Sequence, residues 1–187
     1  MVRYIGAATL VLLIILVLTR TFQLKRVGIK AIQFGEKDKK DFLILPFAFL
    51  LFYIVFASAF GLPELGGELF NNEFTGWIRV AACVMGILLF IYALISFGIS
   101  FRVGLDEDHP GELVTTGAFS ISRNPIYTAF GLVLTGIFFV IPNWIILIYV
   151  FAGIWLFKRQ ILLEEQSLKG IYGEKYAAYC KKVRRFL

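Results

Sequence analysis

Charged residues are scarce in this chain, and long stretches contain none. They make up 17% of the 187 residues, whereas hydrophobic residues make up 59% and the mean hydropathy is +0.79. Soluble domains are roughly 45–50% apolar. Because the few charges gather between long apolar runs, the composition excludes an ordinary soluble domain and indicates an integral membrane protein with a single domain over residues 1–187.

Cysteine and histidine are also rare, with two cysteines and one histidine. Cys83 lies inside an apolar run and Cys180 in a basic segment, so a disulfide scaffold is excluded and we expect two free thiols. We expect no metal site. The net charge of +6 can suggest a nucleic-acid partner, but basic residues beside membrane spans are ordinary topology signals, and we expect no nucleic-acid binding.

Five apolar runs predict an all-α membrane protein with about five transmembrane helices. The expected spans are residues 5–18, 42–62, 77–101, 125–141 and 145–157. A signal peptide is the alternative for the first run, but Leu18 is followed by Thr19 and Arg20 in place of a small-residue cleavage site. We expect residues 20–41 to form a solvated loop. Residues 1–101 would hold three spans, and residues 102–187 a loop, a helical hairpin and a C-terminal cap.

The basic residues predict the orientation of these spans. Seventeen of the nineteen lysines and arginines fall on one side, and only Arg3 and Arg79 fall on the other. The positive-inside rule therefore predicts that the N-terminus is outside and that the C-terminus and the 102–124 loop are cytoplasmic.

A polar sequence leads into the fourth span at this cytoplasmic face. Asn124 followed by Pro125 is a helix-start pattern, with Asn as a favoured N-cap and Pro at the first helical position. The free N–H groups of a helix start attract anions, and the guanidinium of Arg123 suits a carboxylate or a phosphate. The pattern thus predicts an anion-binding spot; the alternative is that Arg123 only anchors the chain to lipid phosphates.

An acidic pair lies at the other end of the predicted hairpin. Counted from the corner at residues 142–144, Pro125 and Glu164 differ in depth by only about 7 Å, so Glu164 and Glu165 should be neighbours of Arg123. Helical spacing turns Glu165 inward. Either Glu165 forms an ion pair with Arg123 or Lys158, or the carboxylates line a cavity for a zwitterionic or polar ligand.

Two glycines and an amphipathic segment follow the acidic pair. We expect Gly170 and Gly173 to break the helix. Residues 174–182 predict a short cytosolic amphipathic helix with Tyr176, Tyr179 and Val183 on one side, which would cover the cavity.

Residues 102–187 carry LVTTGAF, RNPIY, a hairpin, EE, YGEKYAAY and a basic end. In residues and spacing this region resembles the isoprenylcysteine carboxyl methyltransferase and phospholipid methyltransferase superfamily of integral membrane enzymes. The resemblance implies that S-adenosylmethionine binds in a cytosolic pocket capped by the C-terminal segment. It also implies that a lipophilic acceptor enters from the bilayer through a side opening.

The resemblance implies roles for individual residues. Leu113, Val114, Gly117 and Phe119 would line the cofactor pocket. Arg123, Asn124, Pro125 and Tyr127 match an Arg-His-Pro-x-Tyr motif in which Asn124 replaces the histidine, so a proton-transfer role at this position is in doubt. Glu164 and Glu165 match an acidic pair that binds the cofactor or the acceptor, and with Arg123 they are the catalytic candidates. His109, in the preceding loop, is a further candidate for the cofactor site.

The sequence therefore predicts an S-adenosylmethionine-dependent methyltransferase that aligns a methyl donor with a lipophilic acceptor and excludes water. The acceptor would be a carboxyl group of the isoprenylcysteine kind or a phospholipid amine, with membrane lipids as the other partners. The alternatives are an NADPH-dependent membrane reductase of the sterol reductase type, which shares a similar R-x-P-x-Y and acidic pattern, and a non-enzymatic lipid-binding protein.

Overall fold

A computed structural model describes residues 3–28, 44–70, 76–100 and 111–187. In these ranges the chain is helical and contains two isolated β-bridges but no strand. The elements are α1 (Arg3–Arg26), α2 (Ile44–Phe60), α3 (Gly76–Phe97), η3 (Gly98–Ser100), η4 (Gly117–Ser120), α4 (Pro125–Val140), α5 (Trp144–Tyr172) and α6 (Glu174–Lys182). The all-α fold expected from the sequence is confirmed.

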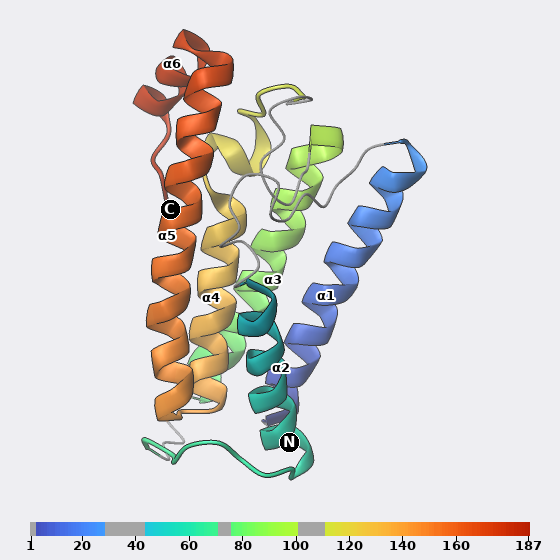
Figure 1. The fold of residues 1–187 in the computed structure, drawn as a ribbon, viewed down its shortest axis with the longest axis vertical. Helices are drawn as coiled ribbons and strands as arrows, with labels where there is room; N and C mark the ends of the chain where they lie inside the picture. Colours follow the sequence, from blue (N-terminus) through green and yellow to red (C-terminus); the bar gives the residue numbers. More distant parts are fainter. Residues whose placement is uncertain (1–2, 29–43, 71–75, 101–110) are drawn as a thin grey trace.

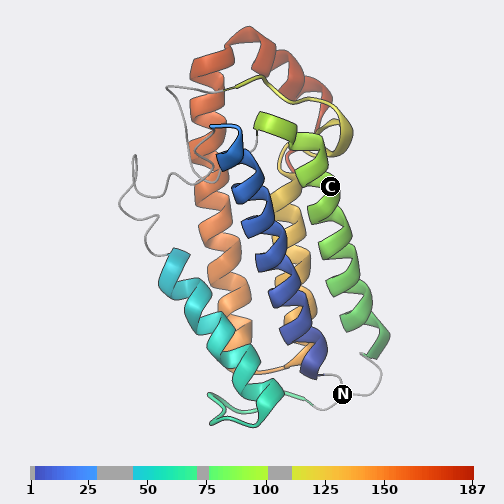
Figure 2. The same cartoon turned by 90° about the vertical axis from the view of Figure 1, so that its right-hand side faces the viewer.

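Helices α1 to α5 form a bundle in which successive helices run in opposite directions (Figure 1). The chain begins at one end of the bundle, and α6 lies across the opposite end, above α5 (Figures 1 and 2). Residues after α6 turn back along the bundle, so the chain reaches its last residue beside α5 rather than at the tip (Figure 1). Loops 111–124, the upper part of α5 and α6 therefore gather at one end.

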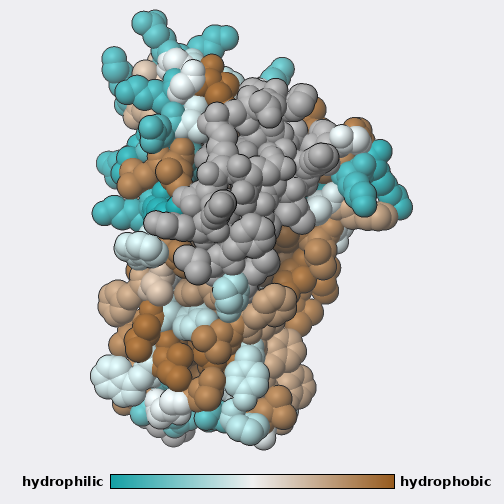
Figure 3. Space-filling view, viewed as in Figure 1, coloured by the Kyte–Doolittle hydropathy of each residue, from teal (hydrophilic) through white to brown (hydrophobic). Residues whose placement is uncertain are grey.

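Three helical segments are long and apolar enough to cross a bilayer, namely α1, α3 together with η3, and α5. Helices α2 and α4 are apolar but shorter, with 17 and 16 residues. Hydrophobic residues dominate the lower part of the surface in Figure 3, and hydrophilic residues gather around α6 and the upper part of α5. The protein is an all-α integral membrane protein whose α5 extends beyond the apolar belt.

Helices α3 and α4 pack most closely, because glycines let their backbones approach. A Cβ on Gly86 would lie 2.7 Å from Cγ2 of Val133, and a Cβ on Gly136 would lie 2.6 Å from Sγ of Cys83. Small residues commonly permit such contacts between membrane helices. Gly86 of α3 and Gly136 of α4 are thus the small residues that allow this close contact.

The end of the bundle opposite α6 is held by the corner between α4 and α5. The side chain of Asn143 accepts a hydrogen bond from N–H of Ile145 at 2.7 Å, which caps α5, and its amide donates to the carbonyl of Leu65 at 2.7 Å. Nearby, the guanidinium of Arg3 contacts the carboxylates of Glu64 and Glu68 at 2.5 and 2.7 Å. These contacts attach the loop after α2 to the start of α1 and to the corner.

Two boundary predictions were wrong. Residues 20–26 belong to α1 rather than to a loop, because the added turns bury Leu24, which is 2% exposed and packs in a cluster with Phe90. Gly170 does not break α5, since one glycine inside a helix costs only about 1 kcal/mol. The break comes at Gly173, which has φ of 53° and donates its N–H to the carbonyl of Lys169 at 3.0 Å.

Candidate active site

The segment that leads into α4 lies against α3 through a glycine and a serine. Gly117 begins η4 with φ of 61°, and a Cβ there would lie 2.8 Å from Cβ of Ser96. The hydroxyl of Ser96 accepts a hydrogen bond from N–H of Ala118 at 2.9 Å. A residue with a side chain would be strained at Gly117 and would collide with Ser96. Gly117 therefore fixes the path of this segment.

Phe119 connects the same segment to both α3 and α6. Its ring packs edge-on against Phe97 with centroids 4.8 Å apart, and its carbonyl accepts a hydrogen bond from the hydroxyl of Tyr179 at 2.6 Å. Burial raises the pKa of Tyr179 to about 12, against the lowering effect of Arg123. Tyr179 thus stays protonated at neutral pH and can donate this bond, which docks α6 onto η4.

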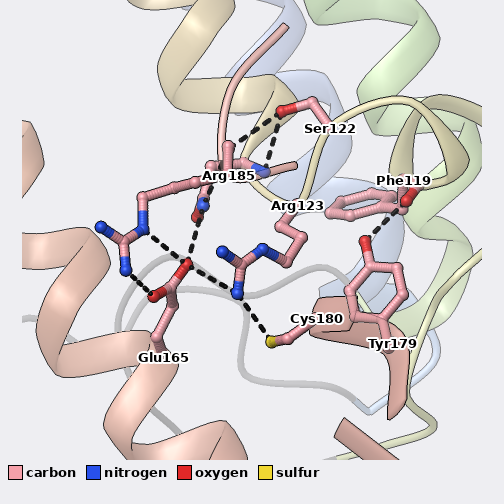
Figure 4. Close-up of polar contacts among 8 residues, drawn as sticks. Phe119, Ser122, Arg123, Glu165, Tyr179, Cys180 and Arg185 are labelled. Atoms are coloured by element: carbon pink, nitrogen blue, oxygen red, sulfur yellow. Dashed lines mark hydrogen bonds and ion pairs between the residues drawn. The ribbon is translucent and has the colours of Figure 1, made fainter. Parts of the chain in front are cut away.

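Arg123 reaches under α6 toward α5. Its Nη1 lies 3.4 Å from Oε1 of Glu165 and contacts Sγ of Cys180, and its side chain is 14% exposed (Figure 4). Its Nε is buried and has no hydrogen-bond partner among the described residues. A buried guanidinium with an unused donor can donate a hydrogen bond to a further anionic or polar group.

Asn124 occupies the N-cap position of α4, as the sequence predicts, but its side chain does not cap the helix. Its amide nitrogen lies 3.4 Å from Oε1 of Glu165 and donates to the carbonyl of Arg185 at 3.2 Å. The expected capping role is therefore wrong, because the side chain is drawn into contacts with α5 and with the segment after α6. The side chain of Asn124 therefore leaves the backbone N–H groups in the first turn of α4 uncapped.

Glu165 is the centre of the cluster. Nε of Arg185 donates a hydrogen bond to Oε1 of Glu165 at 3.1 Å, and Nη2 of Arg185 donates one to Oε2 at 2.7 Å. Arg123 and Asn124 also contact this carboxylate (Figure 4). Its side chain is 12% exposed. The prediction that Glu165 faces inward is confirmed, and so is its proximity to Arg123. The Glu165 hydrogen bond raises the pKa of the Arg185 guanidinium.

Glu164, the residue before Glu165, forms a separate contact with α4. Oε1 of Glu164 accepts a hydrogen bond from the hydroxyl of Tyr127 at 2.5 Å, and the Tyr127 ring packs near Phe157 with centroids 5.7 Å apart. Tyr127 is the third residue of α4 and lies in its first turn. The two carboxylates therefore contact α4 at different depths, Glu165 at its start and Glu164 within it.

Residues 183–187, which we call the strap, return from α6 to the start of α4. N–H of Arg123 donates to the carbonyl of Arg184 at 2.9 Å, and the hydroxyl of Ser122 donates to the carbonyl of Arg185 at 3.2 Å. Ser122 is fully buried. The strap therefore covers the junction between the Arg123–Asn124 segment and Glu165.

The structure assembles only part of the predicted cofactor set. Arg123, Asn124 and Glu165 meet directly, Tyr127 joins through Glu164, and Pro125 begins α4. Leu113 and Val114 lie half-buried in an irregular segment before η4, and Gly117 and Phe119 contact α3. His109 lies outside the described residues.

Four residues of the cluster were missed in the sequence: Ser122, Tyr179, Cys180 and Arg185. Tyr179 was expected only on the apolar face of α6, and Arg185 only among the basic topology residues. Because the strap has no regular periodicity, no pattern indicated that it turns back to Glu165. The one available signal is the adjacent pair Arg184 and Arg185 after an amphipathic helix.

Comparison with known proteins places these motifs in a family. Residues 74–175, more than half of the chain, match the family described as phospholipid methyltransferase. The chain belongs to this family. It is also 31% identical over 105 residues to Protein-S-isoprenylcysteine O-methyltransferase B of Arabidopsis thaliana, a match that covers 54% of this chain and 52% of that protein. The chain therefore spans about half the length of that curated relative.

The family match covers one part of the cluster and leaves out another. Arg123, Asn124, Tyr127 and the two glutamates lie inside residues 74–175, whereas Tyr179, Cys180 and the strap lie outside. The superfamily resemblance drawn from the motifs is thus confirmed. The contacts made by the strap to Glu165 are features of this chain that the matched range does not include.

Proposed function

We propose that the protein is an S-adenosylmethionine-dependent methyltransferase that acts on a lipophilic acceptor held in the membrane, through a carboxyl group or a phospholipid amine. The observation that carries the proposal is the buried cluster of Arg123, Asn124 and Glu165, which joins two motifs of a methyltransferase family at the end of the bundle. Membership of that family supports a methyl donor as the cofactor.

The residues present fit such a cofactor. Its amino-acid part is zwitterionic, and the site offers carboxylates in Glu164 and Glu165 and a guanidinium in Arg123 with a buried donor that has no partner among the described residues. When bound, the cofactor would supply an electrophilic methyl group and its own leaving group. The chain would bind and orient both reactants and exclude water, with Arg123 holding a carboxylate and the glutamates holding ammonium or hydroxyl groups.

The contacts at Glu165 add a condition to this assignment. Both of its oxygens already receive Arg185, and Oε1 also faces Arg123 and Asn124. An ammonium that binds Glu165 must therefore replace one of these donors, and Arg185 is the most exposed of them. The strap is expected to shift when the cofactor binds.

The basic residues support an orientation in which this end of the bundle is cytoplasmic and the N-terminal end is outside. In the sequence, seventeen of nineteen lysines and arginines fall in the segments that are predicted to be cytoplasmic. A water-soluble cofactor would then reach Arg123 from the cytosol, while the acceptor reaches the site from the lipid.

Replacement of Glu165 with Gln tests the site. It removes the charge but keeps the shape, and turnover should fall by more than about tenfold because two arginines lose their shared anion. Methyl transfer from radiolabelled cofactor to a lipid extract measures turnover, and calorimetric titration of detergent-purified protein measures cofactor affinity. Glu64→Gln, at the other end of the bundle, is the matched control.

Unchanged activity and unchanged cofactor affinity in Glu165→Gln would contradict the site assignment. Titration of the purified wild-type protein with S-adenosylmethionine, S-adenosylhomocysteine and NADPH separates the candidate functions. Binding of the first two supports the methyltransferase. Binding of NADPH alone would instead favour the reductase, and binding of none would favour a non-enzymatic lipid-binding protein.

A further inference from the structure

The end of α6 and the strap carry positive charge that no acidic side chain neutralises. Residues 169–187 contain six lysines and arginines but only one acidic residue, Glu174. Lys181 and Lys182 in the last turn of α6 and Arg184 of the strap are all exposed. None of these three side chains forms an ion pair within the part of the chain that the structure describes. We call these three side chains the basic face.

The opposite end of the bundle is arranged differently. There the exposed guanidinium of Arg3 is paired with Glu64 and Glu68. The C-terminal end of a helix attracts cations, which accounts for the two lysines in the last turn of α6 but not for Arg184, which lies beyond the helix. Because an exposed cation is stable in water alone, the position of the basic face decides which partner it meets.

The hydrogen bonds of the strap place it at the surface of the bilayer. Helix α4 has 16 residues and is therefore about 24 Å long, which is less than the ~30 Å thickness of the hydrocarbon core. The start of α4 thus cannot stand far above the lipid. N–H of Arg123, two residues before α4, donates to the carbonyl of Arg184 at 2.9 Å. Arg184 is therefore held at the depth of the lipid headgroups.

Phe186 adds an apolar side chain on the lipid side of the strap. It is 45% exposed and lies beside Ile154 and Leu162 of α5, which are 55% and 45% exposed. Segments that lie in the plane of a membrane combine such apolar side chains with lysines and arginines that contact anionic headgroups. The sequence KKVRRF, residues 181–186, contains both kinds within at most about 20 Å of chain.

The strap contacts the candidate site mainly through its backbone. The carbonyl of Arg184 accepts from N–H of Arg123, and the carbonyl of Arg185 accepts from the amide of Asn124 at 3.2 Å. The side chain of Arg185 turns inward to Glu165 (Figure 4). The basic face is exposed, so a ligand can bind there while the strap keeps all of these contacts.

We propose that the basic face docks on anionic phospholipid headgroups of the leaflet at this end of the bundle, with Phe186 inserted beside them. Phosphate oxygens accept charge-assisted hydrogen bonds from guanidinium and ammonium groups. Each basic side chain close to an anionic surface increases partitioning roughly fivefold. The docked lipid holds the strap in place, and with it the carbonyls that contact Arg123 and Asn124. This interaction does not depend on the reaction that the protein catalyses.

Hydrogen exchange of the strap amides tests the docking. The full chain is placed in nanodiscs of phosphatidylcholine alone and in nanodiscs with equal amounts of phosphatidylcholine and phosphatidylglycerol. Exchange of residues 181–187 should be at least about fivefold slower with phosphatidylglycerol, whereas exchange of α3 should not change. About 1 M salt should remove the difference, because it screens exposed charges. Equal exchange of the strap in the two lipids would overturn the proposal.

Two double variants with the same change in charge locate the effect. Lys182→Gln with Arg184→Gln should reduce the lipid dependence of strap exchange to within about twofold. Lys25→Gln with Arg26→Gln, at the end of α1, should leave it as in the wild type. All four side chains are exposed, so neither pair should prevent folding. An unchanged lipid effect in the first pair, or an equal loss in both pairs, would contradict a docking face on the strap.

A direct binding measurement and a soluble polyanion distinguish lipid from other partners. Phosphatidylglycerol and phosphatidylcholine with the same acyl-chain fluorophore are titrated into purified protein in neutral detergent. Phosphatidylglycerol should bind at least about tenfold more tightly, and Lys182→Gln with Arg184→Gln should lose this preference. Equal binding of the two lipids by the wild type would refute the assignment. Polyglutamate that slows strap exchange in phosphatidylcholine nanodiscs as much as phosphatidylglycerol does would identify an acidic protein as the partner, against the proposal.

Discussion

Two asparagines begin helices in this protein, next to a proline in each case, and they behave differently. Asn143 follows Pro142 and caps α5 with its side chain, which accepts from N–H of Ile145 at 2.7 Å. Asn124 precedes Pro125 at the start of α4, but its side chain turns away from the helix to Glu165 and to the strap. The same residue therefore stabilises a helix at one end of the bundle and belongs to the candidate site at the other.

The ion pairs at the two ends of the bundle also differ, because those near Arg3 are exposed and those of Glu165 are buried. The side chains of Arg3, Glu64 and Glu68 are 43%, 37% and 52% exposed, and such pairs contribute only about 0–1 kcal/mol to stability. The side chains of Arg123 and Glu165 are 14% and 12% exposed, where desolvation offsets much of the attraction. A buried cluster of this kind agrees better with the proposed ligand-binding role than with a stabilising role.

Among the changes that test the difference between the two ends of the bundle, the largest effect is expected for Asn124→Ala. This change removes the amide that holds Glu165 and the strap, and methyl transfer should fall by about tenfold. Because no cap bond is lost, the melting temperature should change much less than in Asn143→Ala. Parallel measurement of turnover and of thermal unfolding checks both statements. Full activity in Asn124→Ala would end the functional distinction between the two asparagines.

Asn143→Ala should give the reverse result. It removes the cap of α5 and the hydrogen bond to Leu65, and the two losses together should lower the free energy of unfolding by about 2 kcal/mol. Turnover per folded molecule should match the wild type, because the corner is at the opposite end of the bundle from Glu165. Denaturant titration in detergent measures the loss, and reduced turnover at a temperature where the variant is fully folded would contradict this interpretation.

The smallest effect is expected for Arg3→Gln. Its ion pairs are exposed, so the free energy of unfolding should fall by less than about 1 kcal/mol. Salt screens exposed pairs, and the difference from the wild type should disappear at about 1 M salt. Unfolding of both proteins at low and high salt provides the measurement. A larger, salt-independent loss would mean that the outer pairs are structurally as important as the buried cluster.

Most of the backbone followed from local patterns in the sequence. The start of α4 at Pro125 was expected from proline and capping preferences, the corner at residues 142–144 was expected between two apolar runs, and α6 covers residues 174–182 as predicted. Counting residues along the hairpin also brought Glu165 to Arg123, because straight helices convert residue number into depth. These results depend on regular geometry, which sequence periodicity reports well.

The remaining parts of the site depend on contacts between distant segments. Arg185 lies 20 residues beyond Glu165 in an irregular strap, and nothing in its neighbours specifies the path of that strap. Asn124 has the residue type of a cap, yet competing donors and acceptors from two other segments decide where its amide points. Local sequence rules fail at this residue, as is common where a side chain is needed by a functional site.

The length of α5 also determines where the candidate site stands. Its 29 residues span about 44 Å, whereas the hydrocarbon core of a bilayer is about 30 Å thick. The Asn143 corner anchors one end of this helix, so the length of α5 fixes the distance of Glu164 and Glu165 from that membrane face. In a thicker bilayer the lipid surface rises along this helix toward the carboxylates, and in a thinner one it recedes. The thickness of the host membrane thus sets how far an acceptor must rise out of the lipid to reach the site.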